Sequence, residues 1–316
     1  MSVFTTVTPE QLQAWLKRYP LGELLDLKGI ASGITNTNYF VTTDMGRYVL
    51  TLFEKNSADE LPYFLDLMAH LADRGIPCPH PIENIDNHYL GELNGKPAAL
   101  VTCLRGSSLD KPSTAHCAEM GAVLARMHLA GSDFPQTMEN PRGPHWWQTA
   151  SAALMPFLDD PQRTLLEEEL AYQATFRHSE LPRGVIHADM FRDNVLFDGD
   201  QLTGLIDFYY ACNDALAYDL AITVNDWCVN TDGSLDDARM HAMLDAYHRE
   251  RPLTVTERLA WPALLRAAAL RFWLSRLYDQ HHPQPGELTH AKDPDHFRRI
   301  LALRIRNHQA LQAVLA

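Results

Sequence analysis

The sequence predicts an α+β fold in two lobes, a small N-terminal lobe with an antiparallel sheet and a large, mainly helical C-terminal lobe. The chain has 316 residues, and chains of this length usually fold into more than one lobe or domain. Strand patterns dominate before residue 104, and helical periodicity dominates after it. We therefore expect domains at residues 1–104 and 105–316, joined by a short connector near residues 103–110.

The N-terminal lobe is expected to contain two helices and five strands. Residues 8–20 open like a helix, and residues 24–55 hold apolar runs separated by glycines, which predicts three antiparallel strands. Apolar residues at helical spacing over 59–74 predict a second helix with Asp59 as its N-cap. An Asn-Gly pair at residues 94–95 predicts a tight hairpin between two further strands.

The C-terminal lobe reads as helical with one clear interruption. Residues 114–131 and 156–178 predict long helices. The Asp-Gly pair at residues 198–199 marks a hairpin, the strongest strand signal in this half. Beyond residue 215 the pattern is helical nearly to the end, and residues 261–280 form its strongest segment.

Composition narrows the class of protein. The net charge is −13, whereas a nucleic-acid surface should be basic, so we expect no nucleic-acid partner. The five cysteines form no CxxC pair, which argues against a disulfide framework and against a zinc site. The N-terminal segment lacks the features of a signal peptide, and no apolar run is long enough to span a membrane. These observations predict a cytoplasmic protein without a membrane partner.

The segment VIHADMFRDNVLF, residues 185–197, places polar residues between two short β-prone runs. Asp and Asn are common turn residues, so a surface turn is one interpretation. The other interpretation is a loop that acts on phosphate. It is favoured because Asn194 follows Asp189 at a fixed offset and Asp207 follows the next hairpin.

Transfer of a phosphoryl group from ATP needs this set of residues. The transferred group carries diffuse negative charge, so the reaction depends on positioning and on cations. Asp189 is the predicted catalytic residue, which accepts the proton of the substrate hydroxyl. Asn194 and Asp207 are the predicted ligands of Mg²⁺, which bridges the ATP phosphates. Two acids alone would repel ATP, whereas two acids with Mg²⁺ attract it. The predicted cofactors are therefore ATP and Mg²⁺.

On these residues the chain resembles the aminoglycoside phosphotransferase and choline kinase group, whose members have a bilobal protein-kinase-like fold. The segments NTNYFV, YVLTLFEK, RMHLAG, NDWC and LRAAALRFWLSRLYD resemble the homoserine kinases of this fold. The resemblance covers nearly the whole chain. It implies a nucleotide-binding N-terminal lobe and a C-terminal lobe that carries catalysis and substrate binding. It also implies phosphorylation of the L-homoserine hydroxyl to O-phospho-L-homoserine, a step of threonine biosynthesis.

The resemblance also assigns residues to the nucleotide. Gly33 and Asn36 lie where such kinases close a glycine-containing hairpin over the phosphates, although an ordinary hairpin would use the same residues. Cys103 and Leu104 lie where family members bond the adenine edge through backbone groups. His187 resembles the histidine that braces the catalytic loop.

Two positions depart from the family pattern. Family loops often have proline where Arg192 stands, and the strand that usually presents a lysine or arginine has Thr51. Lys55, at the end of that strand, either reaches back to the phosphates or is a solvated lysine. Glu60 either braces a cation or favours a helix N-terminus. Thr51 motivates one alternative function, a catalytically silent nucleotide-binding module.

A homoserine-like acceptor needs a cation for its carboxylate and an acid for its ammonium group. Arg271 and Arg276 are the candidate cations, although Arg271 could equally form an ion pair with Asp219 or Asp226. Asp226, in the segment NDW, is the candidate ammonium ligand. The predicted substrate residues are thus Asp189, Asp226 and Arg271. A kinase for choline, ethanolamine, hydroxylysine or methylthioribose is the alternative within enzymes, and the sequence leaves the oligomeric state open.

Overall fold

The computed structural model describes residues 4–30, 36–176, 180–282 and 292–315. It divides into two compact units, the first ending at Arg105 and the second beginning at Gly106. The α+β architecture is confirmed, with an antiparallel sheet in the first unit and mainly helices in the second. In the described residues no helix is both long enough and apolar enough to cross a membrane.

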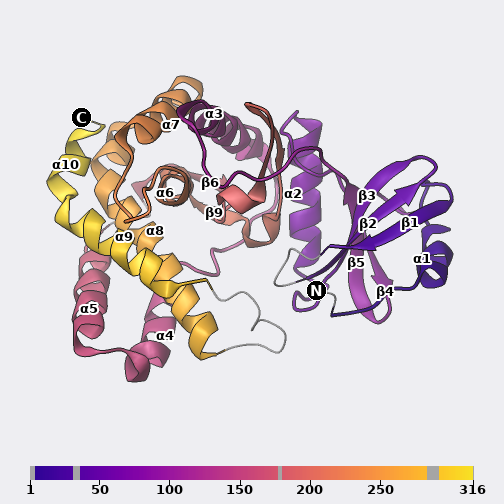
Figure 1. The fold of residues 1–316 in the computed structure, drawn as a ribbon, viewed down its shortest axis with the longest axis horizontal. Helices are drawn as coiled ribbons and strands as arrows, with labels where there is room; N and C mark the ends of the chain where they lie inside the picture. Colours follow the sequence, from indigo (N-terminus) through magenta and orange to yellow (C-terminus); the bar gives the residue numbers. More distant parts are fainter. Residues whose placement is uncertain (1–3, 31–35, 177–179, 283–291, 316) are drawn as a thin grey trace. The chain divides into compact units, whose positions relative to one another are not determined.

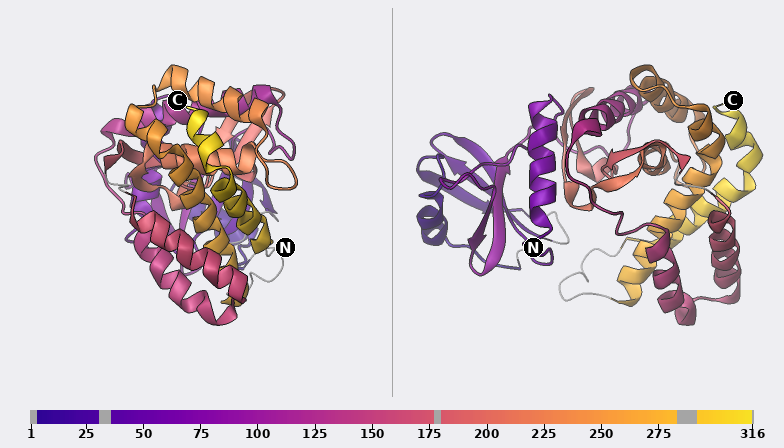
Figure 2. Two further views of the ribbon diagram at one scale, coloured as in Figure 1. Left: turned by 90° about the vertical axis from the view of Figure 1, so that its left-hand side faces the viewer. Right: turned by 180° about the vertical axis from the view of Figure 1, so that it is seen from behind.

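The first unit contains one antiparallel sheet and two helices. The sheet has the order β1-β2-β3-β5-β4, and Figures 1 and 2 show it between α1 and α2. The elements are α1 (Pro9–Leu16), β1 (Leu24–Gly29), β2 (Thr37–Thr43), β3 (Gly46–Leu52), α2 (Leu61–Asp73), β4 (Leu90–Leu93) and β5 (Lys96–Thr102). The expected succession of helix, three strands, helix and two strands is confirmed.

Local sequence explains two boundaries of this unit. Asn94 and Gly95 adopt positive φ of 54° and 76°, the conformation of the tight hairpin that joins β4 to β5. The prediction of Asp59 as N-cap is wrong by one residue, because α2 begins at Leu61 after Glu60. The Glu60 N–H donates to the Ser57 carbonyl at 3.3 Å, so a turn occupies the residues just before the helix.

The second unit is built from eight helices within its described residues, and Figure 1 shows α3 alongside α7. Gly121 permits this close approach, since a Cβ atom there would lie 2.2 Å from the Met243 carbonyl oxygen. The helices are α3 (Thr114–Ala130), α4 (Pro144–Leu154), α5 (Asp160–Ala174), α6 (Leu216–Trp227), α7 (Asp237–Glu250), α8 (Val255–His281), α9 (Pro294–Arg306) and α10 (His308–Ala313).

One predicted helix starts later than the sequence indicated. The helical pattern over 156–178 begins as a helix only at Asp160, because Asp159 caps it and forms a capping box with Gln162. A separate short 3₁₀ turn precedes it at Met155–Phe157. The proline at position 156 falls within that turn, where it disrupts no helix.

Two antiparallel ribbons of strands lie among the helices of this unit. Strand β7 (Val195–Asp198) pairs with β8 (Gln201–Leu205) through the predicted hairpin. Strand β6 (Arg183–Ile186) pairs with β9 (Cys212–Ala215). The sequence did not predict β9, since its four residues CNDA place two polar residues side by side and lack a strand pattern. Pairing with β6 therefore decides its conformation.

Candidate active site

The polar segment that follows β6 and precedes β7 forms the candidate catalytic loop. Its two apolar flanks are strands, as the sequence predicted. Val195 pairs with Leu205 at the end of the β7–β8 hairpin. Just beyond this pair, the Ile206 N–H donates to the Asn194 carbonyl at 2.9 Å. The hairpin therefore brings Asn194 and Asp207, the two predicted magnesium ligands, to the same end of one ribbon.

Asp189 lies within this loop, with its side chain 19% exposed. The Asn194 amide group donates to the Asp189 backbone carbonyl at 2.8 Å and to its Oδ2 atom at 3.1 Å. The Arg271 guanidinium lies 3.9 Å from the Oδ1 atom. Burial raises the pKa of the Asp189 carboxyl, while the charge of Arg271 acts in the opposite direction. A fixed carboxylate of this kind suits the orientation and deprotonation of an acceptor hydroxyl.

Asn194 and Asp207 fit the chemistry of a magnesium site. The Asn194 NH₂ group faces two acceptors, which fixes its orientation, and within the described residues no donor occupies its Oδ1 atom. Asp207 is the residue before a 3₁₀ turn and has φ of 66°. Burial and the neighbouring carboxylates of Asp189 and Asp193 raise the pKa of Asp207 to about 7. Accumulated negative charge of this kind favours a cation.

The donor set also indicates how such a cation would be held. Among the described residues there is no group of three His, Cys, Asp or Glu side chains that would enclose a metal ion. Mg²⁺ is typically bound by one or two protein oxygens, and phosphate oxygens and water complete its coordination. Asn194 and Asp207 supply such a partial set.

A buried network beneath the loop fixes its backbone. The Asp219 carboxylate accepts hydrogen bonds from the backbone N–H groups of His187 at 2.8 Å and Ala188 at 2.9 Å. Its Oδ2 atom also lies 3.1 Å from His128 Nε2, and His128 Nδ1 lies 2.7 Å from the Tyr247 hydroxyl. Ala188 has φ of 63°, an uncommon conformation for a residue with a side chain. The network therefore holds a strained loop in place.

His187 braces the loop, as the resemblance implied. It is fully buried, and its Nε2 atom lies 3.0 Å from the Ile206 carbonyl. The Asp189 N–H donates to His187 Nδ1 at 3.3 Å. Burial lowers the pKa of His187, so a neutral ring with its proton on Nε2 satisfies both contacts.

The predicted substrate residues have specific partners within the second unit. Asp226 accepts hydrogen bonds from the Arg192 backbone N–H at 2.8 Å and from its Nε atom at 3.0 Å. The alternative pairing of Arg271 with Asp219 or Asp226 is wrong, because the carboxylate near Arg271 is that of Asp189. Arg192, the departure from the family pattern, thus fastens the loop to α6.

Arg271 is buried yet poorly satisfied. Its side chain lies over the rings of Phe272 at 3.7 Å and Tyr210 at 5.4 Å, and the residue is 4% exposed. Within the described residues its only acid neighbour is Asp189, and no hydrogen bond engages its guanidinium. The buried Tyr218 hydroxyl likewise has no hydrogen-bond partner in the described part of the chain. The Arg271 guanidinium, beside the candidate base, therefore remains available for an acceptor.

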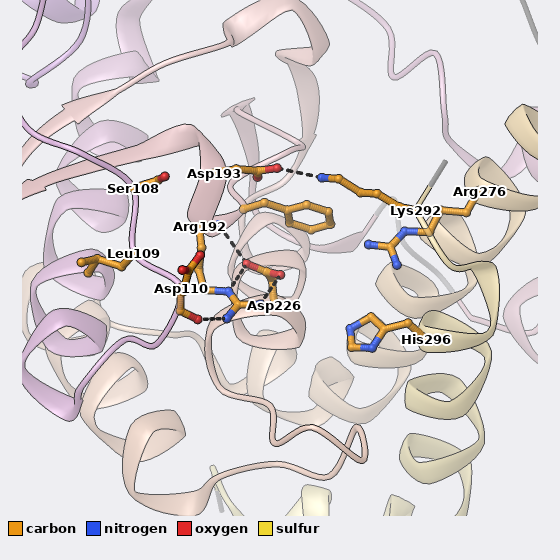
Figure 3. Close-up of a pocket in the computed structure, with 10 residues that line it drawn as sticks. Ser108, Leu109, Asp110, Arg192, Asp193, Asp226, Arg276, Lys292 and His296 are labelled. Carbon is orange, nitrogen blue, oxygen red and sulfur yellow. Dashed lines mark hydrogen bonds and ion pairs between the residues drawn. The ribbon is translucent and has the colours of Figure 1, made fainter. Parts of the chain in front are cut away.

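A cavity of about 310 Å³ adjoins the catalytic loop in the second unit. Figure 3 shows Arg192 and Asp226 on one side of it and Arg276 and His296 on the other. It is lined by Ser108, Leu109, Asp110, Phe191, Arg192, Asp193, Asp226, Arg276, Lys292 and His296. Its size lies at the lower end of the range for small-molecule sites.

The predicted nucleotide residues belong to the first unit. Gly33 lies outside the described residues, and Asn36 is buried with its Oδ1 atom accepting from the Glu54 N–H at 3.4 Å. Lys55 is exposed just after β3. The Cys103 N–H donates to the Arg47 carbonyl at 3.2 Å. Among the described residues, no hydrogen bond uses the Cys103 carbonyl or the Leu104 N–H, which fits a backbone adenine contact.

Thr51, the strand position that lacks a lysine, has a structural contact. Its hydroxyl donates to Asn38 Oδ1 on β2 at 2.8 Å, and the residue is 4% exposed. Glu60 is the N-cap residue of α2, but its carboxylate makes no capping hydrogen bond and instead accepts from the Asn56 side chain at 2.7 Å. The contacts of Thr51 and Glu60 therefore do not show which cation would bind the phosphates.

Comparison of the sequence and the fold with known proteins finds similarity to phosphotransferases. The model of the phosphotransferase enzyme family matches residues 26–253. A protein of Methylobacillus flagellatus named homoserine kinase is 64% identical over 99% of this chain and 98% of the relative. A homoserine kinase of Methylobacillus glycogenes is 63% identical over 95% of each chain. An amicoumacin kinase structure with AMP-PNP and Ca²⁺ superposes with a TM-score of 0.70 at 13% identity, covering 97% of this chain and 94% of that one.

Proposed function

Because the chain belongs to the phosphotransferase enzyme family, we propose that it transfers the γ-phosphoryl group of ATP to the hydroxyl of L-homoserine. The products are O-phospho-L-homoserine, which serves threonine biosynthesis, and ADP. The observation that carries the chemistry is the hairpin that sets Asn194 and Asp207 at one end of a ribbon beside Asp189. The two relatives named homoserine kinase, matched over nearly their full length, support the substrate.

In this proposal the catalytic loop supplies the reactive groups. Asp189 orients the acceptor hydroxyl and accepts its proton as the new bond to phosphorus forms. Asn194 and Asp207 would hold Mg²⁺, which when bound neutralises phosphate charge. Arg271, 3.9 Å from Asp189, contacts the acceptor at its reacting end, and its charge favours the ionised form of the base. The second domain, residues 105–316, thus carries catalysis and acceptor binding.

The first domain, residues 1–104, binds the nucleotide in this proposal. The backbone of Cys103 and Leu104 bonds the adenine edge, and backbone amide groups within residues 33–38 contact the phosphates. Lys55 supplies the cation that β3 lacks. The exposed position of Lys55 after that strand supports this role.

The test is ADP release by the purified protein with Mg-ATP and a panel of alcohols: L-homoserine, L-serine, L-threonine, choline, ethanolamine, hydroxylysine and methylthioribose. Preference for L-homoserine is expected, since the site offers both acidic and cationic groups. Preference for choline or another member would retain the mechanism and replace the substrate. ATP binding without ADP release on any alcohol would instead favour the silent binding module.

A further inference from the structure

The cavity beside the catalytic loop contains one partly buried cation without an acid partner. Arg192 pairs with Asp226 at 3.0 Å, and Lys292 pairs with Asp193 at 2.7 Å. Arg276, on α8, forms no ion pair with any acid in the described residues. Two of the three cations that line the cavity are therefore neutralised, and the third is not.

The surroundings of Arg276 leave most of its hydrogen-bonding capacity unused. Its NH1 atom donates to the Asp293 backbone carbonyl at 2.9 Å, and its guanidinium lies 4.5 Å from the Phe297 ring centroid. A guanidinium has five N–H donors, and Figure 3 shows this group directed toward the cavity. Burial lowers the pKa of Arg276, and the charges of more distant carboxylates, Asp226 first among them, only partly offset this effect. Arginine suits a carboxylate in such a place, because its planar fork binds both oxygens.

The opposite wall carries the complementary charge. Asp226 Oδ2 accepts both short hydrogen bonds from Arg192, whereas its Oδ1 atom has one long contact, at 3.4 Å. Asp110 is exposed on the same side. His296 stands near Arg276, and burial lowers its pKa, so it adds a neutral ring at neutral pH. The cavity thus offers a cation on one wall and carboxylate oxygens on the other.

We propose that this cavity binds the α-amino-acid end of the acceptor, with its carboxylate on Arg276 and its ammonium group on Asp226 Oδ1. The assignment rests on the proposed function and identifies the residues that distinguish an amino acid from a simple amino alcohol. Phe191 and Asp193 line the cavity and lie in the same loop as Asp189. An acceptor held here by its charged end can therefore extend its hydroxyl along the loop toward the base. Arg271 remains at the reacting end.

Three acceptors that share a primary hydroxyl test the assignment. L-Homoserine has both charged groups, 3-amino-1-propanol lacks only the carboxylate, and 4-hydroxybutanoate lacks only the ammonium group. In Arg276→Gln, kcat/KM for L-homoserine should fall about 10- to 100-fold, the range expected for a charge-assisted contact. The value for 3-amino-1-propanol should change less than about twofold, since it has no carboxylate to lose. Arg276→Lys should be intermediate, because it keeps the charge without the fork.

Control variants separate this effect from a general loss of structure. Arg298→Gln removes an arginine from α9 that pairs with Asp295 and does not line the cavity, so its kinetics should match the parent protein. The KM for ATP and the thermal unfolding midpoint are measured for each variant. Arg271→Gln should lower kcat for L-homoserine and 3-amino-1-propanol alike. Loss of discrimination in Arg271→Gln but not in Arg276→Gln would overturn the assignment.

Calorimetric titration with L-homoserine separates failure of this inference from failure of the proposed function. If the parent protein phosphorylates L-homoserine and Arg276→Gln keeps the same ratio of kcat/KM for L-homoserine to that for 3-amino-1-propanol, the proposed function stands. The assignment of the cavity to the amino-acid end is then rejected. Binding that depends on Arg276, without ADP release, would retain the cavity and reject the function. Absence of both binding and turnover in the parent protein would reject both.

Discussion

The catalytic loop and the end of strand β3 contrast sharply, although both were singled out in the sequence. In the loop, each predicted residue is held by named contacts, and Asp219 alone binds two consecutive backbone N–H groups. Within β3, the Thr51 hydroxyl is bonded to the neighbouring strand β2, and Lys55, after the strand, is exposed. The difference shows that the candidate catalytic residues are held in one well-bonded loop, whereas no buried lysine lies at the end of β3 in the described part of the chain.

The largest expected effect comes from the loop. Asp189→Ala should lower kcat by about 10³-fold or more, because the acceptor hydroxyl loses its base, while Mg-ATP affinity changes little. Single-turnover kinetics and nucleotide titration measure the two quantities. Asp207→Ala is the matched comparison, and it should weaken Mg-ATP binding as well as the rate. Undiminished turnover in Asp189→Ala would remove the loop from the mechanism.

Removal of the support beneath the loop should have the next largest effect. Asp219→Ala leaves the N–H groups of His187 and Ala188 buried without an acceptor, so we expect about 3 kcal/mol of destabilisation and a lower kcat. Denaturant unfolding and steady-state kinetics measure both. Asp232→Ala, which alters an exposed acid hydrogen-bonded to Ser234, is the control and should change neither quantity appreciably.

Asp219 also makes the free energy of unfolding depend on pH, and the sign of this dependence can be predicted. Burial would raise the pKa of Asp219, but the hydrogen bonds from the His128 side chain and the His187 backbone outweigh it and lower the pKa. A carboxyl whose pKa is lower in the folded state stabilises the fold above its unfolded pKa, and this stabilisation is lost as pH falls through the folded pKa. The difference in unfolding free energy between the parent protein and Asp219→Ala should therefore shrink below about pH 4. A difference independent of pH would contradict a charged Asp219.

Variants at the end of β3 should have smaller effects. Lys55→Met should raise the KM for ATP about tenfold if this lysine replaces the missing strand cation, since one charge-assisted contact is lost. Thr51→Val should instead cost about 1 kcal/mol of stability, because only the bond to Asn38 is lost, and should leave the KM for ATP nearly unchanged. The reverse pattern would assign the phosphate contact to Thr51 rather than Lys55.

The smallest effect is expected at Ala188. Its φ of 63° suits glycine better than alanine, so Ala188→Gly should relieve strain. We expect its kcat to stay nearly unchanged and its free energy of unfolding to stay within about 1 kcal/mol of the parent value. Ala188→Val should destabilise the loop, because a β-branched side chain tolerates this conformation poorly. Thermal unfolding of the two variants, compared with their kcat values, measures the strain.

The sequence by itself determined the class of fold, the order of elements in the first unit and the catalytic loop. These features depend on local signals, such as strand alternation, the Asn-Gly and Asp-Gly turns, and the offsets from Asp189 to Asn194. It also predicted Asp207 as a magnesium ligand, because a single hairpin separates that residue from the loop. The boundaries that it missed, at Asp59 and near residue 156, depend on which of several capping residues is used.

Only the tertiary structure decided the partners of the charged residues. No local pattern relates His128, Asp219 and Tyr247, which lie on three different helices and meet beneath the loop. Nor does spacing show that Arg192 pairs with Asp226, while Arg276 lacks an acid among the described residues. A charged side chain selects its partner by distance and desolvation after the chain has folded, and these quantities are not encoded in the residues beside it.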